Sequence, residues 1–430
     1  MISQLIFSSL AILAITIFSY KMYRIVSNIK RGKKINRYDQ PRKRLLIMLR
    51  VAFGQSKMNI RFVPAALHLV VYVGFLIVNI EVLEIILDGV LGKHRIFGEI
   101  GTAYNFLIAT FEVFALLVWV ACMIFLIRRN FFKIFRFSGR ELNGWPRGDA
   151  NAILISEMLL MSAFLIMDAA DCKLQAAGDP YYSLAGSFPI SGYLVGFLPD
   201  EIDALIKIER TCWWFHITGI LLFLNYLPYS KHLHIFMAFP NTYFSRLGPI
   251  GSMDNMDSIF NEVLAARNPT YLPIEMEPST FGAKDVSELS WVNLLNAYSC
   301  TECGRCTDSC PANITGRKLS PRKIMMDTRA RVTEVGKNLA IHGAGYKDEK
   351  SLLDSYISRE EIWACTSCNA CIEACPVNID PLSIIMSMRR YIVMEESSAP
   401  PSLNTMMTNI ENNQAPWRFS PADRLNWAKD

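Results

Sequence analysis

Residues 300–311 read CTECGRCTDSCP, and residues 364–377 repeat the pattern as ACTSCNACIEACPV. In each run three cysteines are two residues apart, and a fourth follows after three more residues, directly before a proline. Runs with this spacing hold [4Fe–4S] clusters, and the fourth cysteine of each run ligates the cluster of the other run. The spacing therefore predicts two clusters. One is held by Cys300, Cys303, Cys306 and Cys375, and the other by Cys365, Cys368, Cys371 and Cys310.

The alternative for these cysteines is zinc. Structural zinc sites use separated Cys-x2-Cys pairs with four ligands per ion, and two complete runs that each end in Cys-Pro do not divide in that way. The 54 residues between Cys310 and Cys365 also exceed a compact ferredoxin hairpin. They contain an amphipathic segment at 320–335, with Ser320 as N-cap and Pro321 at the first helical position. We therefore expect a helical two-cluster ferredoxin domain over residues 292–394.

The first half of the chain has the composition of a membrane protein. The whole chain is 51% hydrophobic and only 19% charged, where a soluble domain is nearer a quarter charged. A spanning helix needs about 20 apolar residues, and five segments approach or exceed this length, the fourth only with its flanks. Their positions are 2–20, 62–87, 100–127, 153–167 and 211–229. We expect an all-α protein in which a five-helix transmembrane domain over residues 1–237 precedes the ferredoxin domain.

The distribution of basic residues predicts the orientation of these segments. Residues 21–61 contain 13 Lys and Arg and residues 128–149 contain six, against two and three in the opposite loops. Basic loops stay in the cytoplasm, so the N-terminus is expected outside and the ferredoxin domain in the cytoplasm. A cleaved signal peptide at 2–20 is the alternative, but that segment has no basic residue before it and no small-residue cleavage site, which favours an uncleaved anchor.

Four histidines are candidates for haem ligands. His68 lies inside the second segment, and His216 and His234 bracket the fifth. If the helix continues to His234, 18 residues separate the last two by about 27 Å, which puts both rings on one face and His234 at the depth of His68. Paired imidazoles from facing helices hold b-type haem, and the alternative is that these are packing histidines. A second haem would use His216 and His94, the histidine of the outer loop.

The fifth segment and its exit, WWFHITGILLFLNYLPYSKHLHIF, resemble the last helix of the cytochrome b subunit of respiratory nitrate reductase and of heterodisulfide reductase. The resemblance implies haem ligation at His216, His234 and His68, while Val78 occupies the position of the family's other ligand. The cysteine half resembles the helical ferredoxin of the heterodisulfide reductase C subunit. The whole chain is similar to the C subunit of the quinone-interacting membrane-bound oxidoreductase, with the two modules in the opposite order.

These features predict an electron-transfer subunit that connects the quinone pool, haem b and two [4Fe–4S] clusters with a soluble partner. The resemblance implies that the partner is an iron–sulfur subunit of the heterodisulfide reductase B type, and nothing indicates nucleic acid binding. The alternative is a membrane-tethered iron–sulfur sensor or assembly protein without haem. Glu112 and Glu157 could relay quinone protons or could be satisfied by neighbouring helices, and Cys172 and Cys212 could form a disulfide.

Two further regions complete the expected organisation. Residues 238–291 form a connecting segment rich in Pro, Asn, Gly and Met, and residues 395–430 form a polar C-terminal arm with four prolines. The direction of electron flow and the quinone type stay open at this point.

Overall fold

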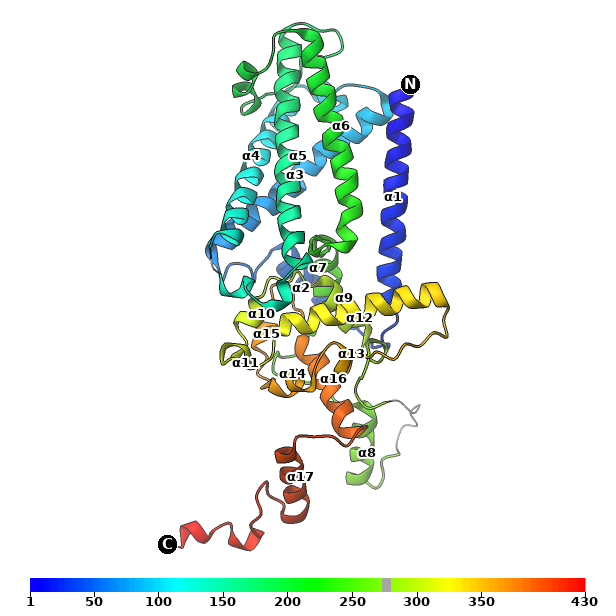
Figure 1. Ribbon diagram of the computed structural model, residues 1–430, viewed down its shortest axis with the longest axis vertical. Coiled ribbons are helices and arrows are strands. Elements are labelled where there is room, and N and C mark those ends of the chain that lie inside the picture. The colour runs from blue at the N-terminus through cyan, green and yellow to red at the C-terminus, as the bar shows by residue number, and fades with distance from the viewer. Residues whose placement is uncertain (133, 273–279, 430) are drawn as a thin grey trace.

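A computed structural model describes residues 1–132, 134–272 and 280–429. These residues form helices and two isolated β-bridges but no sheet, which confirms the all-α prediction for the described part of the chain. Figure 1 shows an elongated molecule in which a bundle of long helices stands above a smaller helical domain that contains both cysteine runs. The C-terminal arm extends away from that domain.

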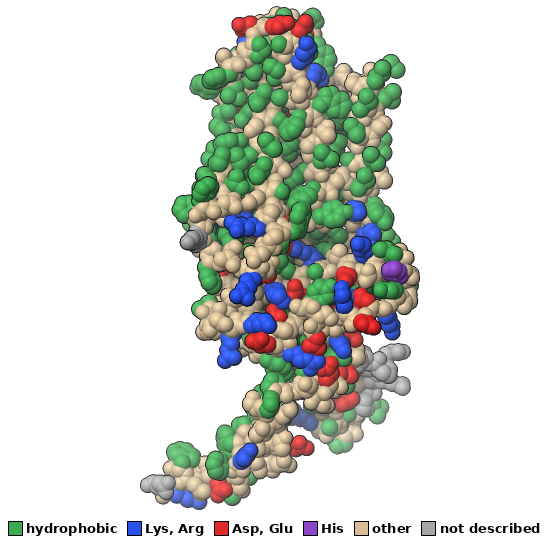
Figure 2. All heavy atoms as spheres, viewed as in Figure 1, with side chains coloured by type: hydrophobic (Ala, Val, Ile, Leu, Met, Phe, Trp, Pro, Cys, Tyr) green, Lys and Arg blue, Asp and Glu red, His purple; other side chains and the backbone are tan. Residues whose placement is uncertain are grey.

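The bundle contains five long helices, α1 (Ile2–Ile29), α3 (Phe62–Leu91), α4 (Thr102–Asn130), α5 (Trp145–Ala176) and α6 (Ile202–Tyr226). Helix α5 packs between α4 and α6, α3 packs against α4, and α1 leans on α3 and α6. Figure 2 shows apolar side chains over most of this part, with charged side chains gathered mainly below it. Four of these helices, α1, α3, α4 and α5, are long and apolar enough to cross a membrane.

The fifth expected crossing differs from the other four. Helix α6 is formed, but it falls outside the group of sufficiently apolar helices, because its first turns carry charged residues and its middle carries tryptophans and His216. It also ends sooner than the continuous helix to His234 that we expected. Two short 3₁₀ turns come after its last residue, and Pro228 lies in the first of them. A new helix, α7 (His234–Tyr243), then begins at His234. Proline cannot donate the hydrogen bond that would continue the helix.

The smaller domain is built from α9 (Trp291–Ser299), α12 (Pro321–His342) and α16 (Pro381–Met394), which share one hydrophobic core. The shorter helices around them are α10 (Arg305–Asp308), α11 (Pro311–Ile314), α13 (Leu352–Ser355), α14 (Arg359–Ala364) and α15 (Ala370–Glu373). The Ser320 hydroxyl caps α12 by accepting from the Lys323 N–H, and Pro321 opens the helix as expected. Ser358 caps α14 in the same way.

The two parts are joined by buried contacts rather than by a flexible linker. The last turns of α1 enter the core of the smaller domain through Ile25 and Ile29, and the Asn28 side chain donates to the Tyr298 hydroxyl at 2.9 Å. A carboxylate in the loop between α4 and α5, Glu141, accepts from the buried Arg322 guanidinium at 2.7 Å. The cysteine runs are therefore held at a fixed position beneath the bundle.

Residues outside the long bundle helices and the small domain also form helices. These are α2 (Pro41–Met48), α8 (Asp257–Arg267) and α17 (Pro401–Asn413), and α7 runs across the expected border at 237. The arm is therefore not fully extended, because Pro400 and Pro401 start a helix, as proline often does at a first turn. Parts of the expected connecting segment (273–279) and of the arm (430), and the basic residue at 133, lie outside the described residues.

Candidate functional site

The structure brings the first predicted ligand set together around one narrow cavity. Cys300, Cys303, Cys306 and Cys375 line it, with Cys375 contributed by the second run, and Cys371 of the second set also lines it. The two runs meet because α10 packs against α15. Among the described residues, no three His, Cys, Asp or Glu side chains are placed to bind a single metal ion. In a [4Fe–4S] cube each thiolate binds a different iron, so its ligands surround a cavity instead of meeting at one point.

The second set gathers beside the first. Cys365 lies near Cys310 and Cys368, and Cys371 lies near all three. Cys310, from the first run, is thus placed among cysteines of the second run, as the crossed ligand pattern predicts. In the second set Cys368 is exposed and Cys310 is buried, whereas the first set has two buried cysteines, Cys300 and Cys375, and no exposed one. The second set therefore reaches the surface of the small domain at Cys368.

Backbone hydrogen bonds to the thiols shape both sets. The Ile379 N–H donates to the Cys375 sulfur at 3.3 Å, and the Ser367 N–H donates to the Cys365 sulfur at 3.4 Å. The Arg389 guanidinium donates to the carbonyl oxygens of Ile362 and Cys365, which fixes the entry to the second run. Such bonds hold thiolates in the orientation that cluster binding requires.

Two of the candidate haem ligands lie side by side. The ring centroids of His68 and His234 are 6.3 Å apart. Bonds of about 2 Å from one metal to both imidazoles would place the ring centres about 6 Å apart. The Nδ1 atoms are held by oxygens, 3.2 Å from Gln55 Oε1 for His68 and 3.1 Å from the Lys231 carbonyl for His234. This leaves Nε2 of each ring for a metal, so the pair fits a haem iron.

His216 and His94 each keep one ring nitrogen without a partner. His216 Nδ1 lies 2.9 Å from the Leu160 carbonyl, and its buried Nε2 has no partner among the described residues. His94 Nε2 lies 3.2 Å from Asp171 Oδ1, its buried Nδ1 has no partner in the described part of the chain, and its ring packs against Tyr181 and Tyr182. The two histidines differ in their surroundings, because His94 belongs to a separate polar cluster.

That polar cluster lies at the end of the bundle farthest from the cysteines, and it was not predicted from the sequence. Arg95 is buried and donates to Asp168 and Asp171 at 2.7 and 2.6 Å. A cavity of about 300 Å³ opens beside the cluster, lined by Glu81, Arg95, Trp213 and Trp214 among others. Glu81 is 3% exposed and its Oε2 has no partner among the described residues. The spacing of Glu81, Glu84 and Asp88 on one helical face is the signal that could have found it.

The remaining candidates have structural contacts. Glu112 accepts hydrogen bonds from the backbone N–H groups of Ile190 and Ser191, so it anchors a loop and is satisfied by its neighbours. Cys172 and Cys212 are free thiols.

The fold and the cysteine sites define an iron–sulfur electron-transfer protein with a membrane-type helical part. A family model described as a 4Fe-4S dicluster domain matches residues 299–379. The chain is 28% identical over 99% of its length to the probable iron-sulfur-binding oxidoreductase FadF of Bacillus subtilis, covering 60% of that protein. It is 27% identical over 92% of its length to the EtfAB:quinone oxidoreductase of Syntrophomonas wolfei, covering 55% of it.

A shorter match concerns the cysteine half. A quarter of the chain is 33% identical to the C subunit of the ferredoxin/F(420)H(2)-dependent CoB-CoM heterodisulfide reductase of Methanosarcina acetivorans, covering 52% of that protein. This confirms the expected similarity to heterodisulfide reductase C subunits. The chain spans only 55–60% of the length of the two relatives that it matches almost end to end. No solved structure matches the chain.

Proposed function

We propose that this chain is the membrane subunit of a quinone-linked oxidoreductase, with one b-type haem at His68 and His234 and two [4Fe–4S] clusters at the cysteine sets. When bound, these groups supply one-electron transfer between the quinone pool and a soluble redox partner. The observation that best supports this proposal is that one short loop contacts both the histidine pair and the first cysteine cavity. Gln55 binds the His68 ring, and two residues later the Lys57 carbonyl accepts from Arg305, which lines the first cysteine cavity.

The cavity beside Glu81 is where we place the quinone headgroup. Its volume of about 300 Å³ suits a single ring, and two aromatic side chains, Trp213 and Trp214, line it together with the unpartnered Glu81 carboxylate. Reducing a quinone requires two protons as well as two electrons, and buried carboxylates can exchange those protons. Trp213 is one turn from His216 on α6, which makes His216 the ligand position for a second haem nearer this cavity.

The partner is proposed to be a soluble iron–sulfur subunit of the heterodisulfide reductase B type. The relatives of the cysteine half include C subunits of heterodisulfide reductases, which supports association with another iron–sulfur redox subunit. The exposed Cys368 marks the side of the small domain that this partner would face. The orientation predicted from the basic loops puts that side in the cytoplasm.

The test is a reduced-minus-oxidised optical spectrum of the detergent-purified protein, with haem and iron quantified. We expect b-type haem bands in the wild type and their loss in His68→Ala, with the iron of the clusters retained. His232→Ala is the matched control, because its ring is 5.6 Å from His234 but lies outside the proposed pair, and its haem bands should persist. Cluster iron without any haem band in the wild type would favour the tethered iron–sulfur protein instead.

A further inference from the structure

The two cysteine runs repeat one backbone conformation but differ in charge. Glu302 and Ser367 occupy equivalent positions with φ of 56° and 57°, and Gly304 and Asn369 follow with φ of 75° and 61°. The next position is Arg305 in the first run and Ala370 in the second. The repeat therefore provides an internal comparison in which the first cavity gains a cation that the second lacks.

Arg305 is a buried cation without an acidic partner. It is 7% exposed, it lines the first cavity, and its Nη1 donates to the Lys57 carbonyl oxygen at 3.2 Å. Among residues 1–132, 134–272 and 280–429, no carboxylate lies within ion-pair distance of it, although salt bridges occupy its neighbours. Arg322 is paired with Glu141.

A second unneutralised cation lies near the same cysteine set. Arg136 is 6% exposed and lies near Cys303, with its guanidinium over the Phe137 ring. Its Nε and Nη1 have no hydrogen-bond partner in the described part of the chain. Burial lowers the pKa of Arg136 to about 10, which leaves it charged at neutral pH. Glu302, an acidic residue that lines the first cavity, already forms ion pairs with Lys231 and Arg329.

The second cysteine set has fewer unneutralised cations beside it. Arg389 supplies one cation at Cys365, with its guanidinium over the Trp363 ring. Asp380 lies near Cys371, and its only cation within 4.0 Å among the described residues is Arg246, which it shares with Asp254. Asp254 is also paired with Arg37, and Arg389 has no acidic partner in the described part of the chain. The second set therefore keeps one unneutralised positive charge, whereas the first set keeps two.

We infer that Arg305, supported by Arg136, gives the cysteine set nearest the membrane the higher reduction potential, so that electrons entering at Cys368 move toward the bundle. This deepens the proposed function and rests on it. One added electron makes a cluster more negative, and a nearby buried cation stabilises that state. The direction that follows is reduction of quinone to quinol with two electrons and two protons, with a reduced soluble flavin or iron–sulfur protein being oxidised as donor.

The test is a redox titration of the purified full-length protein, with the two cluster signals followed by EPR spectroscopy. Arg305→Gln should move the higher-potential transition downward, with about a tenfold fall in its ratio of reduced to oxidised cluster at a fixed potential. Arg305→Lys keeps the positive charge, so its higher-potential transition should stay close to that of the wild type. Arg389→Gln is the matched control and should move only the lower-potential transition. Iron content is measured for each variant, so a loss of clusters is not mistaken for a shift.

Two results would overturn the inference. One is a higher-potential transition that stays in place in Arg305→Gln with full iron content. The other is that Arg305→Gln moves the lower-potential transition, which would put the first set on the low-potential side. Neither outcome depends on haem or quinone, so the proposed function and this inference can fail separately.

Discussion

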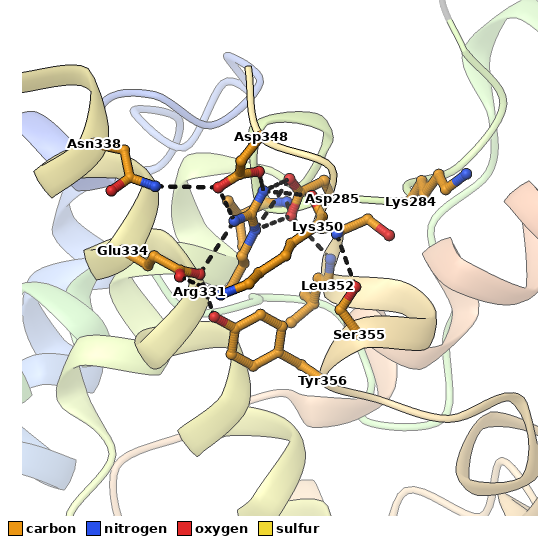
Figure 3. Close-up of polar contacts among 12 residues, drawn as sticks. Lys284, Asp285, Arg331, Glu334, Asn338, Asp348, Lys350, Leu352, Ser355 and Tyr356 are labelled. Atoms are coloured by element: carbon orange, nitrogen blue, oxygen red, sulfur yellow. Dashed lines mark hydrogen bonds and ion pairs between the residues drawn. The ribbon is translucent and has the colours of Figure 1, made fainter. Parts of the chain in front are cut away.

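At the scale of single residues, the cation that organises the small domain is Arg331 on α12 (Figure 3). Its guanidinium binds Asp285 and Asp348 at 2.7 Å each and the Lys350 carbonyl at 2.6 Å, and its side chain is 3% exposed. These contacts tie α12 to the segments before the first run and before the second. The Lys350 side chain, by contrast, is 57% exposed and pairs with Glu334 at the surface.

Replacing Arg331 by Gln should destabilise the small domain much more than replacing Lys350 by Gln. Removing Arg331 leaves two carboxylates without their partner, at a cost of about 3 kcal/mol, while an exposed pair contributes less than about 1 kcal/mol. The measurement is the temperature at which the iron–sulfur absorbance is lost. Equal midpoints for the two variants would contradict the role given to Arg331.

The same contact predicts an acid dependence. The hydrogen bond from Arg331 lowers the pKa of Asp348 below its usual value of 3.8. A carboxylate with a lowered folded-state pKa stabilises the fold above its unfolded pKa, and this stabilisation is lost as the pH falls through the folded pKa. The wild type should therefore lose more stability below about pH 4 than Arg331→Gln does, as seen in thermal midpoints by circular dichroism. Parallel pH profiles would show that Asp348 is not coupled to Arg331.

At the scale of helices, the sequence predicted the types of element better than their ends. The caps at Ser320 and Ser358 were predictable, because a serine hydroxyl directly before a helix accepts a hydrogen bond from a backbone N–H of the first turn. The end of α6 was predicted wrongly, because one helix was extended across Pro228 to His234, although polar residues follow that proline. The pairing of His68 with His234 does not need a continuous helix. It depends on the path of the chain after Pro228: the proline signals that the helix ends, but it does not say where the following turns place His234.

Helix packing in the bundle depends on glycine at α3. A Cβ atom on Gly74 would lie 2.5 Å from Val118 Cγ2 on α4, whereas one on Gly148 in α5 meets nothing within 4 Å. Gly74→Ala should cost about 1–3 kcal/mol, because the buried β-branched Val118 cannot move easily. Gly148→Ala should be neutral or slightly stabilising. The check is the fraction of monodisperse protein after heating in detergent, and a Gly74→Ala variant as stable as the wild type would contradict this packing.

At the scale of the whole molecule, the sequence predicted a membrane-type helical part and a 4Fe-4S domain, since hydropathy and cysteine spacing are local signals. The crossed assignment of the cysteines to two clusters stays a prediction. The sequence did not reveal the cluster of Arg95 with Asp168 and Asp171, which joins a loop to α5 through tertiary contacts. The cations at Arg305 and Arg136 were missed for the same reason. Charge becomes informative only after the fold shows which carboxylates are near.

The orientation can be tested with cysteines placed at the two ends of the molecule. Ser3 and Lys347 are both exposed, and the basic loops predict that they lie on opposite sides of the membrane. In intact cells, a membrane-impermeant maleimide should label Ser3→Cys, and should label Lys347→Cys only after lysis. Labelling of Lys347→Cys in intact cells would show that the small domain lies outside, opposite to the predicted orientation.

We propose that the membrane histidines and the cysteine sets serve one electron path to quinone. Its most direct test is to reduce the purified protein with dithionite, remove the excess, add a water-soluble quinone, and follow haem and iron–sulfur absorbance together. We predict that both are reoxidised in the wild type, and that clusters of His68→Ala stay reduced on the same timescale. Clusters of His68→Ala that are reoxidised as fast as those of the wild type would contradict the account.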